Sequence, residues 1–216
     1  MIKGAIFDLD GTLIDSMPVW MGVGAKYLKQ RGITPKPHFY TDIKFIEVLG
    51  YADYMNREYG LDLEAYSLKD EINRMMEYEY FNSIKLKEGV REFVEALADK
   101  GVKLAVATAT DEYLVREVLT RNGIYDKFTA TFSCRDYKTT KDEPKLYETA
   151  LAALGTKKEE TFIFEDAVYA IKTANKAGFP ICAIYDEAAQ DDWNEITSLS
   201  TYAIESFTQG KEIFGL

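Results

Sequence analysis

The sequence predicts an α/β protein, in which a doubly wound parallel sheet forms the core domain and a small all-helical domain is inserted after the first strand. Two patterns lead to this fold class. From about residue 84 onward, short apolar runs alternate with amphipathic helical segments, which is typical of a parallel sheet covered by helices. Residues from roughly 17 to 83 carry helical patterns only. We therefore expect a core domain of residues 1–16 and 84–216, and a helical domain of residues 17–83.

The individual elements follow in chain order. Residues 2–7 form an apolar run of strand length that ends at an acidic residue. In the helical stretch, Pro18 suits the first turn of a helix and Gly32 its end, and Ser67 with Asp70 resembles a capping box ahead of a helix that reaches about residue 80. Further along, apolar runs predict strands at 102–107, 128–132, 161–164, 181–184 and 202–204. Amphipathic patterns predict helices at 89–100, 112–122, 144–154 and 167–177.

The composition excludes several classes of function. Lys and Arg number 26 and Asp and Glu number 36, so the formal net charge is −10, which repels nucleic acid and anionic membranes. The two cysteines, Cys134 and Cys182, form neither a disulfide framework nor a metal-ligand cluster, and we expect both in the core. The first apolar run lacks the length and the small-residue cleavage site of a signal peptide, so we expect none, and no stretch approaches the ~20 apolar residues of a membrane span. We expect a cytoplasmic monomer that acts on a small molecule.

Polar residues gather in the loops that follow the predicted strands. Because the loops beyond the carboxyl ends of parallel strands form one crevice, residues far apart in the sequence can meet there. The residues in question are Asp8 and Asp10, Thr108, Lys141, and the pair Glu165 and Asp166. We expect them to form a single site.

The chemistry of this set points to phosphoryl transfer with Mg²⁺ as the cofactor. Clustered carboxylates repel one another unless a cation joins them, and hard oxygen ligands without His or Cys favour Mg²⁺ over Zn²⁺. One carboxylate can then attack phosphorus, and a second can protonate the leaving oxygen and later deprotonate water. A lysine and a hydroxyl can stabilise the charge on the transferring group.

Each candidate also has a simpler structural interpretation. Asp8 and Asp10 could belong to a surface turn, but a buried strand that runs straight into two acids makes this a poor description. Thr108 could cap a helix, although Thr110 or Asp111 would suit that position better. Lys141 could be one solvated lysine in a lysine-rich loop. Glu165 and Asp166 could be acids that are favoured at a helix N-terminus.

Four segments resemble the haloacid dehalogenase superfamily, and within it the β-phosphoglucomutase-like branch. They are DLDGTLIDS at 8–16, VATAT at 106–110, KDEPKLY at 141–147 and FED at 164–166. The resemblance implies a Rossmann-like core with a helical cap domain in the place of residues 17–83. It also implies a role for each candidate. Asp8 would be the nucleophile and a metal ligand, and Asp10 would be the general acid/base and a metal ligand through its carbonyl. Thr108 and the Ala109 amide would bind phosphate, Lys141 would contact phosphate and nucleophile, and Glu165 and Asp166 would be the remaining metal ligands.

The sequence departs from the pattern of this branch at several points. Asp142 and Lys145 replace the residues usual around the motif lysine, so Lys138 and Lys145 are rivals of Lys141, although the spacing to Pro144 and Tyr147 favours Lys141. After the acidic pair, Ala167 and Ala170 stand where the branch prefers Ser and Gly, which we expect to tune the metal site rather than abolish it. Trp20 is a candidate for substrate contact in the cap.

The leading functional prediction is a phosphatase that hydrolyses a small phosphorylated metabolite through an aspartyl-phosphate on Asp8. A phosphomutase of the β-phosphoglucomutase type is the first alternative, but the mutases that this chain resembles carry His at the position of Trp20. A phospho-receiver domain uses similar residues, but it is shorter and lacks both the helical insertion and an acid placed like Asp10. A non-catalytic protein that binds phosphorylated metabolites would not need the complete catalytic set.

Overall fold

The computed structural model describes residues 2–43, 46 and 48–216 of the chain. It divides into two compact units, one of Met1–Ser16 with Ile84–Leu216 and one of Met17–Ser83. We call the first the core unit and the second the helical unit. In the described part of the chain, no helix is long and apolar enough to cross a membrane.

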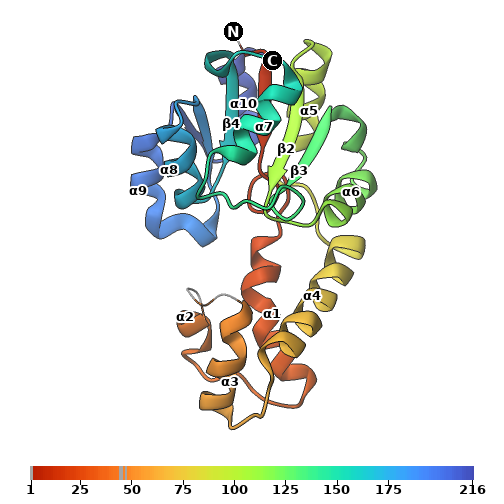
Figure 1. The fold of residues 1–216 in the computed structure, drawn as a ribbon, viewed down its shortest axis with the longest axis vertical. Coiled ribbons are helices and arrows are strands. Elements are labelled where there is room, and N and C mark those ends of the chain that lie inside the picture. Colours follow the sequence, from red (N-terminus) through yellow and green to blue (C-terminus); the bar gives the residue numbers. More distant parts are fainter. Residues whose placement is uncertain (1, 44–45, 47) are drawn as a thin grey trace. The chain divides into compact units, whose positions relative to one another are not determined.

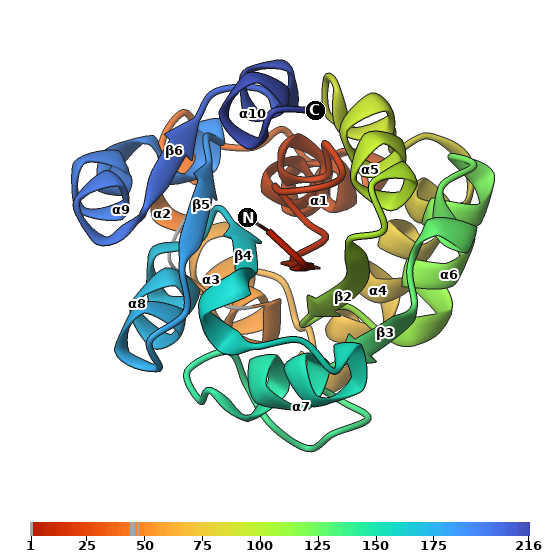
Figure 2. The same ribbon diagram turned by 90° about the horizontal axis from the view of Figure 1, so that it is seen from above.

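The core unit contains a parallel six-stranded sheet with the strand order β3-β2-β1-β4-β5-β6 (Figures 1 and 2). The strands are β1 (Gly4–Phe7), β2 (Lys103–Thr108), β3 (Ala130–Ser133), β4 (Thr161–Glu165), β5 (Ile181–Ile184) and β6 (Tyr202–Ile204). The order reverses direction at β1, so the chain winds outward to both edges of the sheet. This confirms the predicted doubly wound α/β fold.

Helices cover both faces of this sheet (Figure 2). On one face, α7 (Lys145–Leu154), α8 (Val168–Lys176) and α9 (Trp193–Leu199) bury apolar side chains against β1 to β5. On the other face, an aromatic cluster joins the sheet to α5 (Val90–Asp99) and α10 (Phe207–Phe214), and Phe7 of β1 stacks on Phe164 of β4 with ring centroids 4.4 Å apart. The α6 helix (Glu112–Arg121) packs beside β3. Both central strands are therefore buried on both faces, which explains their continuous apolar sequences.

The helical unit consists, over its described residues, of α1 (Met17–Gln30), α2 (Phe39–Ile43), α3 (Tyr51–Tyr59) and α4 (Ala65–Asn82). Its interior is rich in aromatic side chains, since Tyr27, Phe39, Tyr54 and Tyr80 are all buried. Short 3₁₀ helices complete both units, at Val48–Gly50, Tyr125–Lys127, Lys158–Glu160 and Glu187–Asp192. Helical patterning thus predicted the secondary structure of this unit correctly.

Three local predictions need correction. The expected capping box is wrong, because α4 begins two residues before Ser67 and the side chain of Glu64 accepts hydrogen bonds from the amides of Tyr66 and Ser67. The strands β2 and β4 each extend one residue beyond the expected apolar run, to Thr108 and Glu165, because backbone pairing continues past the last apolar residue. The helices α9 and α10 had no predicted counterpart.

Two chain crossings connect the units, and in the core unit they lie side by side. Ile14 and Leu86 form an isolated antiparallel bridge. The amide of Asp15 donates to the carbonyl of Lys85 at 2.9 Å, and the amide of Lys87 donates to the carbonyl of Leu13 at 3.0 Å. The outgoing and the returning segments are thereby fixed to each other next to the loop that carries Asp8 and Asp10.

Candidate active site

The site begins at the carboxyl ends of the central strands. Phe7, the last residue of β1, pairs with Val106 of β2 and with Phe164 of β4. The amide of Asp8 donates to the carbonyl of Phe164 at 2.9 Å, so the backbone of Asp8 is held beside the end of β4. The strand register therefore brings Asp8 next to the end of β4, where Glu165 and Asp166 stand.

The turn after β1, residues 8–14, is closed by its own backbone. The amides of Leu13 and Ile14 both donate to the carbonyl of Leu9, at 2.9 and 3.0 Å. Gly11 has a φ of 81°, which favours glycine, and a Cβ there would lie 2.3 Å from Oδ2 of Asp166. The backbone of Gly11 thus lies against the carboxylate of Asp166, and any side chain at position 11 would displace that carboxylate.

Three carboxylates meet at this point. Asp8, Glu165 and Asp166 are all buried, and each can place an oxygen within 4.8 Å of the others. Lys141 is only 4% exposed, and its ammonium forms ion pairs with Asp8 and with Glu165, the latter at 2.7 Å. One buried ammonium thus contacts two of the three buried carboxylates.

Burial and the neighbouring charges shift the pKa values of Asp8, Asp166 and Lys141. Burial, reinforced by the charges of Glu165 and Asp10 and opposed by Lys141, raises the pKa of Asp8 to about 7. Burial also raises the pKa of Asp166 well above its usual range, with further contributions from Glu165 and Asp8. For Lys141, burial lowers the pKa, but the charges of Asp8 and Glu165 outweigh it, so its pKa lies well above the usual range. The cluster therefore holds more negative charge than its lysine neutralises.

The donor set fits a magnesium ion. All three groups offer hard carboxylate oxygens, which Mg²⁺ prefers, and their excess negative charge favours a cation at the same point. Thr12 donates its hydroxyl to Oδ1 of Asp166 at 2.8 Å, which orients one of the three side chains from behind. The alanines at 167 and 170 offer no side-chain donor, so the threonine of the first loop supplies this hydrogen bond.

Asp10 has different surroundings from Asp8. Its half-buried carboxylate accepts a hydrogen bond from Ser16 Oγ at 2.6 Å and another from Thr110 Oγ1 at 2.5 Å. Ser16 follows the turn of residues 8–14 and Thr110 lies in the loop after β2, so the two oxygens of Asp10 are fixed by separate segments. Asp10 lies close enough to the cluster for its charge to contribute to the raised pKa of Asp8.

The loop after β2 contains the two predicted phosphate ligands. Thr108 is buried at the end of the strand, and its Oγ1 accepts a hydrogen bond from the amide of Thr110 at 3.1 Å. Ala109 is exposed. Asp111 occupies the N-cap position of α6, and its carboxylate forms an ion pair with Arg135 at 2.6 Å. Thr108 is thus not the cap of this helix, and its role as a phosphate ligand stays a prediction.

The rival lysines lie outside the cluster. Lys145 is exposed and donates to the carbonyl of Tyr137 at 2.9 Å, and Lys138 is exposed with a φ of 48°. Lys141 alone of these three is buried against Asp8 and Glu165.

Several groups at the site had no sequence prediction. Tyr147 of α7 donates its hydroxyl to Oε2 of Glu165 at 3.2 Å, the same oxygen that Lys141 contacts. Burial, with the charge of Glu165, raises the pKa of Tyr147 well above its usual range, so it remains a donor. Thr12, Ser16 and Thr110 act through hydroxyl hydrogen bonds. Their only signal in the sequence was their position within or beside the motifs.

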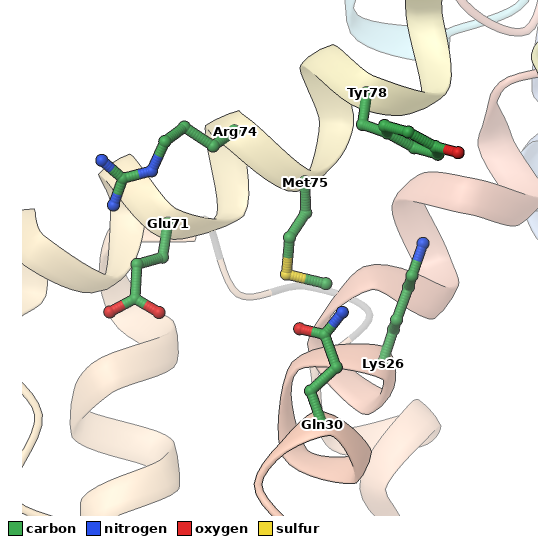
Figure 3. A pocket seen from close by; sticks show the side chains of 6 residues that line it. All are labelled: Lys26, Gln30, Glu71, Arg74, Met75 and Tyr78. Atoms are coloured by element: carbon green, nitrogen blue, oxygen red, sulfur yellow. The ribbon is translucent and has the colours of Figure 1, made fainter. Parts of the chain in front are cut away.

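The helical unit has a groove of its own. Figure 3 shows six side chains around it, and its volume is about 470 Å³. The lining residues come from α1 and α4 and are Lys26, Gln30, Glu71, Arg74, Met75 and Tyr78. None of the predicted site residues lines it. Trp20, the predicted cap residue, instead donates its indole N–H to the hydroxyl of Tyr80 at 3.2 Å, and its role in substrate contact stays a prediction.

Comparison with known proteins places this site in a family. The sequence profile of the haloacid dehalogenase-like hydrolases matches residues 5–184. The phosphorylated carbohydrates phosphatase of Thermotoga maritima is 30% identical over 82% of this chain and 82% of its own length. Hexitol phosphatase B of Escherichia coli K12 is 25% identical over 88% of this chain and 87% of its own.

Solved structures agree on the fold. A candidate beta-phosphoglucomutase from Thermotoga maritima superposes with a TM-score of 0.80 at 20% identity, covering 94% of each chain. A haloacid dehalogenase hydrolase of family IA from Entamoeba histolytica gives a TM-score of 0.79 at 21% identity, covering 96% of this chain and 95% of that one. The resemblance noted in the sequence is thereby confirmed, and the chain belongs to the haloacid dehalogenase-like hydrolase family.

Proposed function

We propose that this phosphoric monoester hydrolase is a Mg²⁺-dependent phosphatase that removes phosphate from a small phosphorylated carbohydrate through an aspartyl-phosphate on Asp8. One observation carries the proposal: Asp8 is buried between an ammonium and two further carboxylates, where a carboxylate, a cation and a phosphate can meet. We expect the enzyme to act as a cytoplasmic monomer on a free metabolite, without nucleic acid or membrane. Its net charge of −10 supports the exclusion of polyanions.

In the first step, an Oδ of Asp8 attacks the phosphorus of the substrate, and the bond from phosphorus to the ester oxygen breaks. Protonated Asp10 gives its proton to the departing oxygen, which leaves as an alcohol. Lys141 contacts Asp8 directly and is placed to bind an oxygen of the transferring group. The Thr108 hydroxyl and the Ala109 amide are the proposed ligands of the other phosphoryl oxygens.

In the second step, water attacks the phosphorus of the aspartyl-phosphate, and the bond from phosphorus to Asp8 breaks. Asp10, now a carboxylate, takes the proton from the water, so the free enzyme and inorganic phosphate are regenerated. The hydroxyls of Ser16 and Thr110 hold both oxygens of Asp10 and would keep it aimed at one position, which the departing oxygen occupies in the first step and the attacking water in the second.

Asp8, the carbonyl of Asp10, Glu165 and Asp166 are the proposed ligands of Mg²⁺. When bound, the ion would balance the excess negative charge of the cluster and screen the incoming phosphate from it. The core unit would serve as catalytic domain and the helical unit as cap domain, with Trp20 as the proposed specificity residue. The relatives named as phosphatases of phosphorylated carbohydrates and of hexitol phosphates support a sugar or polyol phosphate as substrate.

The test is a screen of phosphorylated sugars, polyols and small acids with Mg²⁺, which follows both free phosphate and isomerised product. We expect phosphate release, and we expect Asp8→Asn to lower turnover by about 10³-fold or more, because the nucleophile is lost. Asp126→Asn is the matched control, since Asp126 is a surface residue in an ion pair with Lys127.

The other outcomes of this screen separate the alternatives. Normal turnover by Asp8→Asn would reject the aspartyl-phosphate. Isomerised product without phosphate release would identify a phosphomutase. A long-lived phosphorylated protein without turnover would identify a receiver-like function.

A further inference from the structure

We propose that Lys87 is a positioning residue whose ammonium holds the turn of residues 8–14 in its active conformation. Its effect on turnover rests on the proposed phosphatase function, whereas its effect on the turn itself does not. Neither the sequence motifs nor the proposed mechanism gives Lys87 a role.

The ammonium of Lys87 has a hydrogen-bond acceptor for each of its three N–H groups. Lys87 Nζ donates to the carbonyl of Gly11 at 2.7 Å, to the carbonyl of Tyr185 at 2.7 Å and to Oδ2 of Asp186 at 2.9 Å. An ammonium has three N–H donors, and these three bonds use all of them. Lys87 therefore connects the returning segment, the turn after β1 and the loop after β5.

Burial distinguishes this contact from a surface ion pair. The side chain of Lys87 is 16% exposed and that of Asp186 is 7% exposed. The other oxygen of Asp186 accepts a hydrogen bond from the amide of Ala188 at 2.9 Å, which fixes the carboxylate in the β5 loop. An ion pair that is poorly solvated and hydrogen-bonded on both sides has a defined geometry, whereas exposed pairs contribute little.

Gly11 is the point at which this contact reaches the active site. On one side, its carbonyl accepts from Lys87; on the other, its Cα lies so close to Asp166 that a Cβ would be 2.3 Å from Oδ2. Asp10 is its neighbour in the chain. A shift of Gly11 would therefore move the general acid/base and the contact with a proposed metal ligand together. Displacements of about 1 Å in such groups can lower rates by roughly 10²-fold.

The first variant is Lys87→Met, which keeps the length of the side chain and removes the ammonium. Lys103→Met is the matched control, because Lys103 Nζ also donates to a carbonyl, that of Leu154 at 2.8 Å, but from the amino end of β2. Amide hydrogen exchange is measured in EDTA for Leu13 and Ile14, whose amides close the turn. We expect Lys87→Met, unlike the control, to exchange about tenfold faster there.

The same variants are then compared with Mg²⁺ and substrate. We expect Lys87→Met to lower kcat by about 10- to 100-fold, as the loss of a supporting hydrogen bond at a metal site does. KM should change by less than about threefold, because Lys87 is not a proposed substrate ligand. Lys103→Met should retain the parent values. Because partial unfolding also lowers the apparent kcat at an unchanged KM, kcat is calculated per mole of folded protein, and a thermal denaturation curve of each variant gives the folded fraction at the assay temperature.

A second variant covers the case in which Lys87→Met does not fold because Asp186 is left buried and unpaired. The double variant, Lys87→Met with Asp186→Asn, removes the unpaired carboxylate of Asp186. It is compared with the single variant Asp186→Asn. We expect the double variant to regain thermal stability but not turn protection or kcat. The proposal is wrong if Lys87→Met matches the parent, and the double variant matches Asp186→Asn, within about twofold in the exchange rate of the turn and in kcat. It is also wrong if the double variant regains both the turn protection and the kcat of the parent. If no substrate is turned over at all, the exchange measurement still decides the role of Lys87.

Discussion

Two buried acids of the core cluster and two acids of the helical unit have opposite pKa shifts. In the cluster, burial raises the pKa of Asp8 to about 7 and raises that of Asp166 well above its usual range. In the helical unit, hydrogen bonds from Arg57 and Lys36 lower the pKa of Glu58, and those from Lys26 and Ser83 lower the pKa of Glu79. A carboxylate is thus destabilised as an anion in the cluster and stabilised as an anion at these two positions of the helical unit.

The difference lies in how the charges are compensated. Glu58 and Glu79 each pair with a basic side chain at the surface, where water screens the pair. In the core cluster, Asp8 and Glu165 share one buried lysine, and Asp166 adds a third carboxylate. The two surface pairs balance their own charges, whereas the cluster holds an excess of negative charge that a cation would offset. Variants that change a charge in only one of these two places therefore test the difference between them.

The first prediction concerns Mg²⁺ binding by Glu165→Gln, which removes one charge of the cluster and keeps its shape. Mg²⁺ affinity, measured by isothermal titration calorimetry, should fall by about 10- to 100-fold. Glu79→Gln makes the same chemical change in the helical unit and should leave the affinity within about twofold. Equal affinities in the two variants would show that the cluster does not bind the ion.

The second prediction concerns the stability of the metal-free protein. The folded pKa of Asp8, about 7, lies above its ordinary value of 3.8, so the folded state binds the proton more tightly than the unfolded state. Between about pH 4 and pH 7 this group therefore lowers the free energy of unfolding as pH rises, by an amount on the order of a few kcal/mol.

Chemical denaturation in EDTA checks this against Asp8→Asn, which lacks the titrating group. The parent should lose stability relative to the variant as pH rises through this window. Saturating Mg²⁺ should reverse the trend, because the ion binds the ionised carboxylate. A stability difference between the two proteins that does not change with pH would contradict the raised pKa.

The smallest effect is expected for the ion pair between Lys26 and Glu79, whose lysine side chain is 46% exposed. Lys26→Met should lower the free energy of unfolding by less than about 1 kcal/mol, as exposed pairs usually do. Urea denaturation measures this. A loss above about 2 kcal/mol would mean that the helical unit also depends on a buried charge.

The sequence predicted the fold well where hydrophobic pattern alone decides it. The strands at 181–184 and 202–204 have the predicted bounds, since apolar runs in a buried parallel sheet end where the strand ends. The prediction failed at Ser67 because Glu64, three residues earlier, caps the helix instead, and only geometry shows that its side chain reaches the amides of Tyr66 and Ser67. The short helix α10 is held by Phe207 and Phe214, which pack on Phe93 from 114 and 121 residues further along the chain, and local pattern does not reveal such contacts.

The candidate site shows the same limit. Asp8 and Glu165 could be expected in one cluster because few structural roles suit an acid at the end of a buried strand, whereas Lys141, in the loop before α7, was chosen from the motif that it belongs to. Thr110 and Lys87 could not, since a hydroxyl and a lysine are ordinary in loops. Their importance depends on which carboxylate or carbonyl lies opposite, and that is decided by the loop conformations of distant segments.

The antiparallel bridge between Ile14 and Leu86 bears on how this architecture can change. It makes the two crossings neighbours, like the stems of a hairpin, with Cα atoms about 5 Å apart. An insert whose ends start from adjoining points can be lengthened, shortened or exchanged without altering the strand order of the host. Residues 17–83 can therefore be exchanged between relatives as one insert, and such an exchange would show whether this unit sets the substrate range.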